Sequence, residues 1–313
     1  MFCPFCGTEK TGPFTDEHFL ADCLGWDLTI RVCEDCQRRS NREIDDPFAR
    51  NGPVLIARLA LGVQSRRGEI PSLRFPAAVG RTAEGHEVPV SSRITRDGVD
   101  VRVRSRTEIA EDGKTGSIRG APEDVPAMIE AARERARREG KDLHVVGTSR
   151  HLVEDVEGEF PVSLSLFPRA VAKAALGMAC HFLEQDYART EIADRLRRLM
   201  WSSEPAEWPS LGLVGSAFPD VDDDIRHVGS IFSAGRGHVL ALVPQDDGIA
   251  FVCNLFSTMP SIFRVADDAS RYWTDSTSES VVVVCDAPRH QTTRFNLETF
   301  VHHRCQSEVG ADS

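Results

Sequence analysis

The sequence predicts an α+β protein in which a small metal-bound module is followed by a larger region of antiparallel strands and helices. Three observations carry this prediction: two cysteine pairs near the start, runs of alternating valine or isoleucine, and segments with helical periodicity. The cysteines and their surroundings define a module of residues 1–50. A β-rich, arginine-bearing middle region covers 51–165, and an α+β C-terminal region covers 166–313.

Four cysteines of the module form two pairs, Cys3 with Cys6 and Cys33 with Cys36, and each pair has two residues between its members. This spacing lets both thiolates of a pair reach one ion, and four thiolates suit the closed tetrahedral coordination of structural zinc. A segment this short and polar would fold poorly by burial alone, so the metal would supply much of its stability. We predict a structural Zn²⁺ site at these four cysteines.

An acid–histidine step, Glu17-His18, lies between the two cysteine pairs. An imidazole titrates near neutral pH and can take a proton from water, which makes His18 a candidate general base. Glu17 offers the hard oxygen that Mg²⁺ prefers. The two residues together indicate hydrolytic chemistry on nucleic acid.

The segment after the second cysteine pair is predicted to be a helix from Glu34 to about Asp46. Pro47 should end it, because the residue before a proline avoids helical geometry. On this helix, a stripe of oxygen-bearing side chains is spaced at i, i+4 and i+8 and consists of Gln37, Asn41 and Asp45. Such a stripe is compatible with one further metal ligand and its supporting shell.

Beyond the module, residues 53–63 are predicted to form an apolar helix closed by Gly62. Further helices are expected over 123–139, over 168–187 and, capped by Thr190, over 191–201. Short antiparallel strands are expected over 70–110, followed by strand-like runs around 211–216, 227–232, 237–243, 249–256 and 280–285.

Charge is unevenly distributed along this acidic chain, which has a formal net charge of −11. Residues 51–150 carry 18 basic and 14 acidic side chains and form the only net basic third, so a phosphate backbone would be held there. Period-two alternation from Val101 to Arg106 would place Arg102, Arg104 and Arg106 on one strand face. That face is either a solvated surface or a phosphate-contacting ridge. On the module's helix, Arg38 and Arg42 are further candidate nucleic-acid contacts.

The expected location is the cytoplasm. Met1 is followed at once by the first cysteine pair, which leaves no room for a targeting segment, and no apolar run is long enough to span a bilayer. Nine cysteines without a secretory signal indicate a reducing compartment in which thiols bind metal. We therefore expect no membrane partner.

The order Cys-x2-Cys, Asp-Glu-His, Leu24-Gly25 and Cys-x2-Cys before a helix resembles the HNH, or ββα-metal, endonucleases. It is most similar to the zinc-clasped members that include phage endonuclease VII. The resemblance implies that Glu17 is a ligand of a catalytic Mg²⁺ or Mn²⁺ and that His18 is the base. The family usually places asparagine or histidine after the last cysteine; here this position is Gln37, so Gln37 or Asn41 would be the second ligand.

This resemblance covers residues 1–50, and the remainder loosely resembles bacterial stand-alone HNH proteins. It implies an endonuclease that cuts DNA, duplex DNA ahead of RNA, and that serves in anti-phage defence. Residues 51–313 would then target the substrate, form a homodimer or bind a regulatory protein. The competing interpretation, favoured by Gln37 and by the acidity of the chain, is a catalytically inactive zinc module that binds DNA or protein. The two differ in metal, because only the enzyme needs a second, exchangeable divalent ion.

Overall fold

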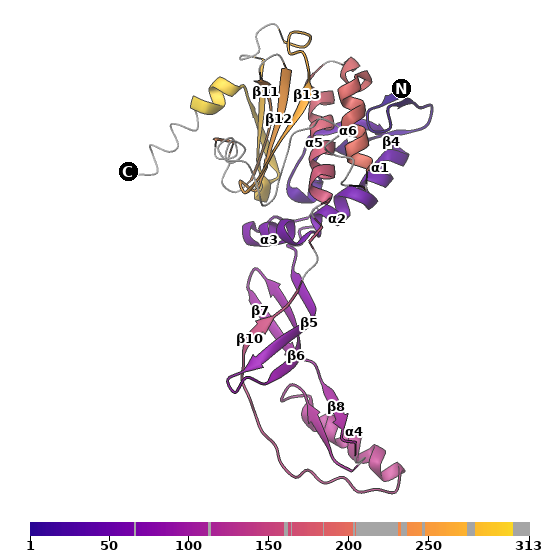
Figure 1. The fold of residues 1–313 in the computed structure, drawn as a ribbon, viewed down its shortest axis with the longest axis vertical. Helices are drawn as coiled ribbons and strands as arrows, with labels where there is room; N and C mark the ends of the chain where they lie inside the picture. The colour runs from indigo at the N-terminus through magenta and orange to yellow at the C-terminus, as the bar shows by residue number, and fades with distance from the viewer. Residues whose placement is uncertain are drawn as a thin grey trace. The chain divides into compact units, whose positions relative to one another are not determined.

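The protein consists of two compact units (Figure 1). In the computed structural model, the first unit comprises Met1–Pro71 with Val162–Ser313, and the second comprises Ser72–Pro161. The described residues are 1–65, 67–111, 114–159, 162–163, 165–183, 185–202, 204, 231–232, 237–245, 248–273 and 279–302. Helices and antiparallel sheets are mixed throughout, which confirms the predicted α+β class. No described helix has the length and apolar character needed to cross a bilayer.

The first unit opens with two small antiparallel hairpins and a helix. Strand β1 (Phe2–Cys3) pairs with β2 (Thr8–Glu9), and β3 (Phe14–His18) pairs with β4 (Thr29–Cys33). Helix α1 (Glu34–Ser40) follows β4 directly, with Cys33 as its N-cap residue. The predicted start of this helix at Glu34 is therefore confirmed.

The predicted end of this helix at Pro47 is wrong. After α1, the chain makes a π-helical turn (Asn41–Asp45) and continues as α2 (Asp46–Ala49). Pro47 stands in the first turn of α2, where a missing N–H costs nothing. Helix α3 (Gly52–Leu61) comes next, and Gly62 ends it in the left-handed conformation, as predicted.

The C-terminal part of the first unit combines helices with one antiparallel sheet. Its helices are α5 (Leu166–Phe182), the short 3₁₀ helix η3 (Gln185–Arg189) and α6 (Glu191–Trp201). Its strands are β11 (His238–Gln245), β12 (Gly248–Leu255), β13 (Met259–Ala266), β14 (Val281–Asp286) and β15 (Gln291–Phe295), in the order β13-β12-β11-β14-β15. A 3₁₀ turn (Ala287–Arg289) connects the last two strands.

The sequence predicted part of this region. Helix α6 has the predicted bounds, and the hydroxyl of Thr190 accepts a hydrogen bond from the backbone nitrogen of Ala193, 3.2 Å away. The expected strands at 237–243, 249–256 and 280–285 are confirmed as β11, β12 and β14, whereas β13 and β15 were missed. The strand expected at 211–216 and most of that at 227–232 lie outside the described residues.

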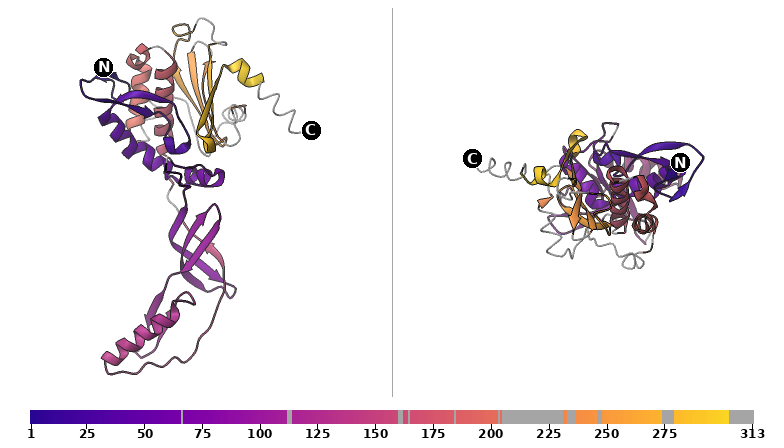
Figure 2. Two further views of the ribbon diagram at one scale, coloured as in Figure 1. Left: turned by 180° about the vertical axis from the view of Figure 1, so that it is seen from behind. Right: turned by 90° about the horizontal axis from the view of Figure 1, so that it is seen from above.

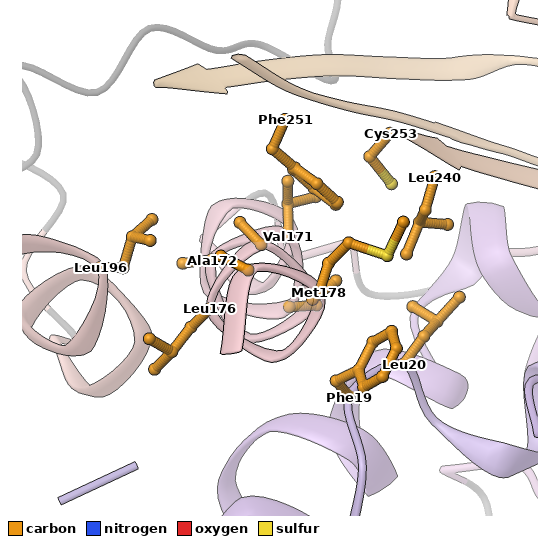
Figure 3. Packing of buried hydrophobic residues seen from close by; sticks show 14 of the residues in the cluster. Phe19, Leu20, Val171, Ala172, Leu176, Met178, Leu196, Leu240, Phe251 and Cys253 are labelled. Carbon is orange, nitrogen blue, oxygen red and sulfur yellow. The ribbon is translucent and has the colours of Figure 1, made fainter. Parts of the chain in front are cut away.

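Helix α5 lies between the sheet and the N-terminal hairpins (Figures 1 and 2). Phe19 and Leu20, from the N-terminal segment, are buried in the same core as Met178 of α5 and Leu240 of β11 (Figure 3). A Cβ atom on Gly177 would overlap the Cβ atom of Phe19, so only glycine permits this close approach. One hydrophobic core therefore joins the cysteine-rich segment to the C-terminal sheet.

The second unit consists mainly of antiparallel strands. Its main sheet has the order β10-β5-β6-β7 and consists of β5 (Leu73–Thr82), β6 (Glu87–Thr95), β7 (Gly98–Val103) and β10 (Val153–Glu157). A hairpin of β8 (Arg106–Ile109) and β9 (Gly116–Arg119) and the helix α4 (Val125–Arg138) complete it. The single strand predicted over 101–106 is wrong. Strand β7 ends at Val103, and Arg106 already begins β8, so Arg102, Arg104 and Arg106 do not share one strand.

Candidate metal centre and active site

The four paired cysteines come together in the first unit. The sulfur atoms of Cys3, Cys6, Cys33 and Cys36 all lie within 4.8 Å of one another. Gly7, with φ +66°, donates its N–H to the carbonyl of Cys3 at 2.9 Å, which closes the tight turn between the first two cysteines. Cys33 ends β4 and Cys36 lies on α1, so the cluster fastens the hairpins to the helix.

The chemistry of this cluster fits a metal ion such as zinc. A hydrogen bond with the Cys36 side chain is the main cause that lowers the pKa of Cys3 to about 4, and the same contact raises the pKa of Cys36. The lowered pKa of Cys3 favours the thiolate, which is the form that binds metal. The predicted convergence of the four cysteines is confirmed, and together they could hold a metal ion such as zinc.

The acid of the acid–histidine step is buried in an ion-pair network. Strand alternation turns Glu17 inward on β3, where its side chain is 5 % exposed. The Nζ atom of Lys173, from α5, donates to Oε1 of Glu17 at 2.7 Å and to Oδ2 of Asp45 at 2.6 Å. The hydroxyl of Ser40 donates to the same oxygen of Asp45 at 3.2 Å. Two carboxylates from different elements thus converge on one cation.

The π-helical turn explains how Asp45 reaches this network. Ser40 and Asp45 are five residues apart, and i→i+5 geometry places such residues on one face. The same turn disrupts the predicted stripe. Gln37 is half-buried and Asn41 is exposed, and none of the hydrogen bonds of Glu17 involves either of them. The structure brings Glu17 together with Asp45 instead.

This network carries an excess of negative charge. Among the described residues, Lys173 is the one cation within ion-pair distance of Glu17 or Asp45, so two carboxylates face one ammonium. Burial raises the pKa of Glu17, and the neighbouring Lys173 only partly opposes this effect. A buried site with one surplus negative charge favours a further cation or a shared proton.

His18 lies one residue further along β3 and nearer to the surface, with its side chain 18 % exposed. Its Nε2 atom is 3.8 Å from Oδ1 of Asp22, in the 3₁₀ turn Asp22–Leu24 that follows β3. Successive side chains of a strand point to opposite faces, so His18 and the buried Glu17 lie on different faces of β3.

The five arginines that the sequence singled out are exposed, and four of them lie beside acidic groups. Arg38 and Arg42 are each 2.7 Å from a carboxylate, that of Asp35 and that of Glu43. In the second unit, Arg102 lies 3.3 Å from the carboxylate of Asp100 and Arg106 lies 3.1 Å from that of Glu108, while Arg104 is exposed in the turn after β7. The charge of these four arginines is thus balanced locally, and the role of all five as nucleic-acid contacts stays a prediction.

Sequence reasoning missed Lys173 and gave Asp45 only a supporting role. A signal for Lys173 was present, because it is the one lysine in the alanine-rich run of α5 and stands between two alanines that are fully buried. A lysine at the centre of a buried helical run normally needs an acidic partner. Nothing in the sequence spacing indicated which acids would supply it.

No family model, no curated protein and no solved structure matches this chain. The chemistry of the site therefore has to be inferred from its own residues.

Proposed function

We propose that this protein is a metal-dependent endonuclease in which a zinc-bound module presents Glu17, Asp45 and His18 to a phosphodiester. The observation that carries the proposal is the convergence of two carboxylates on one cation. The residue that follows Glu17 in β3 is His18, whose Nε2 atom lies 3.8 Å from a carboxylate oxygen of Asp22. The carboxylates come from β3, which pairs with the cysteine-bearing strand β4, and from the π-helical turn that follows α1.

The donor set fits a hard divalent ion. Two carboxylate oxygens are the ligands that Mg²⁺ and Mn²⁺ prefer, and Glu17 and Asp45 would hold the ion in this proposal. Bound there, it would neutralise the charge that develops on the phosphate. Asp45 replaces Gln37 and Asn41 as the ligand from the helix, because its oxygen points to the same cation as that of Glu17.

The remaining catalytic roles belong to His18 and Asp22. The imidazole of His18 takes a proton from the attacking water. The carboxylate of Asp22 stabilises the imidazolium that results. Duplex DNA as the substrate, a homodimer or a regulatory protein partner, and a role in anti-phage defence remain predictions from the family resemblance.

A second candidate function is a zinc module that binds DNA or protein without cutting. The burial of Glu17 and its ion pair with Lys173 favour it, because this pair satisfies the carboxylate without a metal. In that case His18 and Glu17 only stabilise the fold.

A cleavage assay separates the two functions. The zinc-loaded protein is incubated with plasmid, linear duplex DNA and RNA, with Mg²⁺, Mn²⁺ or no added ion; a chelator is avoided because it would also remove zinc. We expect metal-dependent cleavage of DNA, and a rate that falls about 10²- to 10⁴-fold in His18→Ala.

The matched control is His144→Ala, which removes an exposed histidine of the second unit and should cut like the wild type. Intact plasmid under every metal condition, or equal cleavage by His18→Ala, would overturn the nuclease.

A further inference from the structure

Lys173 stands out because it is a charged residue whose side chain is almost fully buried. Its side chain is 1 % exposed, and its neighbours Ala172 and Ala174 are fully buried. The carboxylates that it contacts lie 156 and 128 residues away in the sequence. A buried ion pair of this kind adds little net stability compared with an apolar side chain of similar size. Its presence therefore calls for a reason other than stability.

The position of the ammonium suggests that reason. The Nζ atom lies 2.7 Å from Oε1 of Glu17 and 2.6 Å from Oδ2 of Asp45. A single ion at this position could contact both carboxylate oxygens. A divalent ion held by the same two oxygens needs distances of about 2.0–2.6 Å and would occupy nearly the same point. The ammonium and the ion cannot both be there, and they also repel each other.

We propose that Lys173 is an intrinsic cation of this site that holds Glu17 and Asp45 together and competes with the divalent ion. The inference rests on the proposed function, in which these carboxylates are the metal ligands. Lys173 is thus a positioning residue that sets how tightly the ion binds. The divalent ion must displace an ammonium that donates two hydrogen bonds. The affinity of the site for the ion is therefore lower than that of the two carboxylates without the ammonium.

Replacing Lys173 should affect metal affinity in the opposite direction from replacing a lysine that only maintains the fold. Without the ammonium, the two carboxylates repel each other in the metal-free protein, and an added ion relieves that repulsion. Lys173→Met should therefore lower stability without a divalent ion but bind the ion more tightly. If the lysine only maintained the fold, its loss would distort the site and weaken or leave unchanged the binding of metal.

The experiment measures Mn²⁺ binding to the zinc-loaded full chain by calorimetric titration and by the shift of the unfolding temperature. We expect Lys173→Met to lower the Mn²⁺ dissociation constant by about tenfold or more. Asp45→Asn should weaken binding. The matched control is Arg58→Met, which removes another buried cation, one that donates to the carbonyl of Ala49, and should leave Mn²⁺ affinity unchanged.

A second pair of variants keeps the test decisive if Lys173→Met does not fold alone. Glu17→Gln with Lys173→Met leaves one carboxylate and no ammonium, and it should bind Mn²⁺ more tightly than Glu17→Gln alone. Equal or weaker binding in the lysine variants would overturn the inference. Cleavage that depends on His18 but shows no such tightening would refute the role of Lys173 and keep the nuclease. Tighter Mn²⁺ binding without any cleavage would do the reverse.

Discussion

Helices α5 and α4 have similar lengths, 17 and 14 residues, but opposite environments. In α5, the residues from Ala170 to Ala179 are all buried, whereas α4 in the second unit has no buried residue. Arginine and glutamate pair along α4 at i, i+3, as in Arg133 with Glu130. Such exposed pairs contribute little to stability. The polar groups of the proposed site lie in the first unit, where packing fixes their positions.

The largest expected effect that distinguishes the two units is the loss of the metal from the cysteine cluster. Cys33→Ser should remove zinc and unfold the first unit, because a structural zinc site contributes on the order of 10 kcal/mol of folding free energy. The second unit should keep its structure, since it contains none of the four cysteines. Zinc content and hydrogen exchange, resolved by segment, measure both results.

Cys23→Ser is the matched control, because Cys23 is a half-buried thiol outside the cluster and its replacement should retain zinc. If protection from exchange persisted in residues 1–50 of Cys33→Ser without zinc, the metal would not be what stabilises this segment.

A smaller effect concerns pH and again only the first unit. His238 is fully buried, and burial lowers its pKa from 6.5 to about 4. Its Nε2 atom donates to the carbonyl of Leu24 at 2.8 Å, and its Nδ1 atom accepts from the backbone N–H of Phe256 at 3.1 Å, so the neutral ring is required. Between pH 6.5 and 4 the unfolded chain binds a proton that the folded chain does not. The free energy of unfolding of the first unit should therefore fall as the pH falls.

This loss should amount to roughly 2 to 3 kcal/mol between about pH 7.5 and pH 4.5. Denaturant unfolding at each pH measures it, and His238→Gln, which does not titrate, gives the contribution of all other groups. Equal pH dependence of the wild type and His238→Gln would contradict the role of His238.

The smallest expected effect comes from enlarging one side chain in α5 and one in α4. Gly177→Ala would force the new methyl group into Phe19 and should destabilise the first unit by about 1–3 kcal/mol. Ala131→Leu, on the exposed face of α4, should change the stability of the second unit by less than about 0.5 kcal/mol. Thermal unfolding of both variants measures the difference. Similar costs at both positions would show that α5 can move away from Phe19 without strain.

Local signals in the sequence predicted the local structure well. Thr190 and the helical period that follows it gave both ends of α6, because a cap and an amphipathic repeat act within a few residues. The cysteine spacing predicted the convergence of the four cysteines for the same reason, since both members of each pair were expected to reach one ion.

Prediction from the sequence failed where contacts between residues far apart in the chain determine the local structure. The local preference of the residue before Pro47 predicted that the helix ends there. In the structure a π-helical turn precedes Pro47 and the helix continues to Ala49. That turn directs Asp45 to Lys173, 128 residues away, and no local pattern contains such a contact. The stripe of Gln37, Asn41 and Asp45 assumed regular α-helical geometry, and the wide turn alters it.

The shared core around Phe19, Leu20 and Met178 limits how this protein can have been assembled. A cysteine-rich segment moved by recombination to another gene would carry an unmatched apolar surface into water and would lack the lysine that pairs with Glu17 and Asp45. The first unit is thus discontinuous in sequence, because segments on both sides of Ser72–Pro161 contribute to its core.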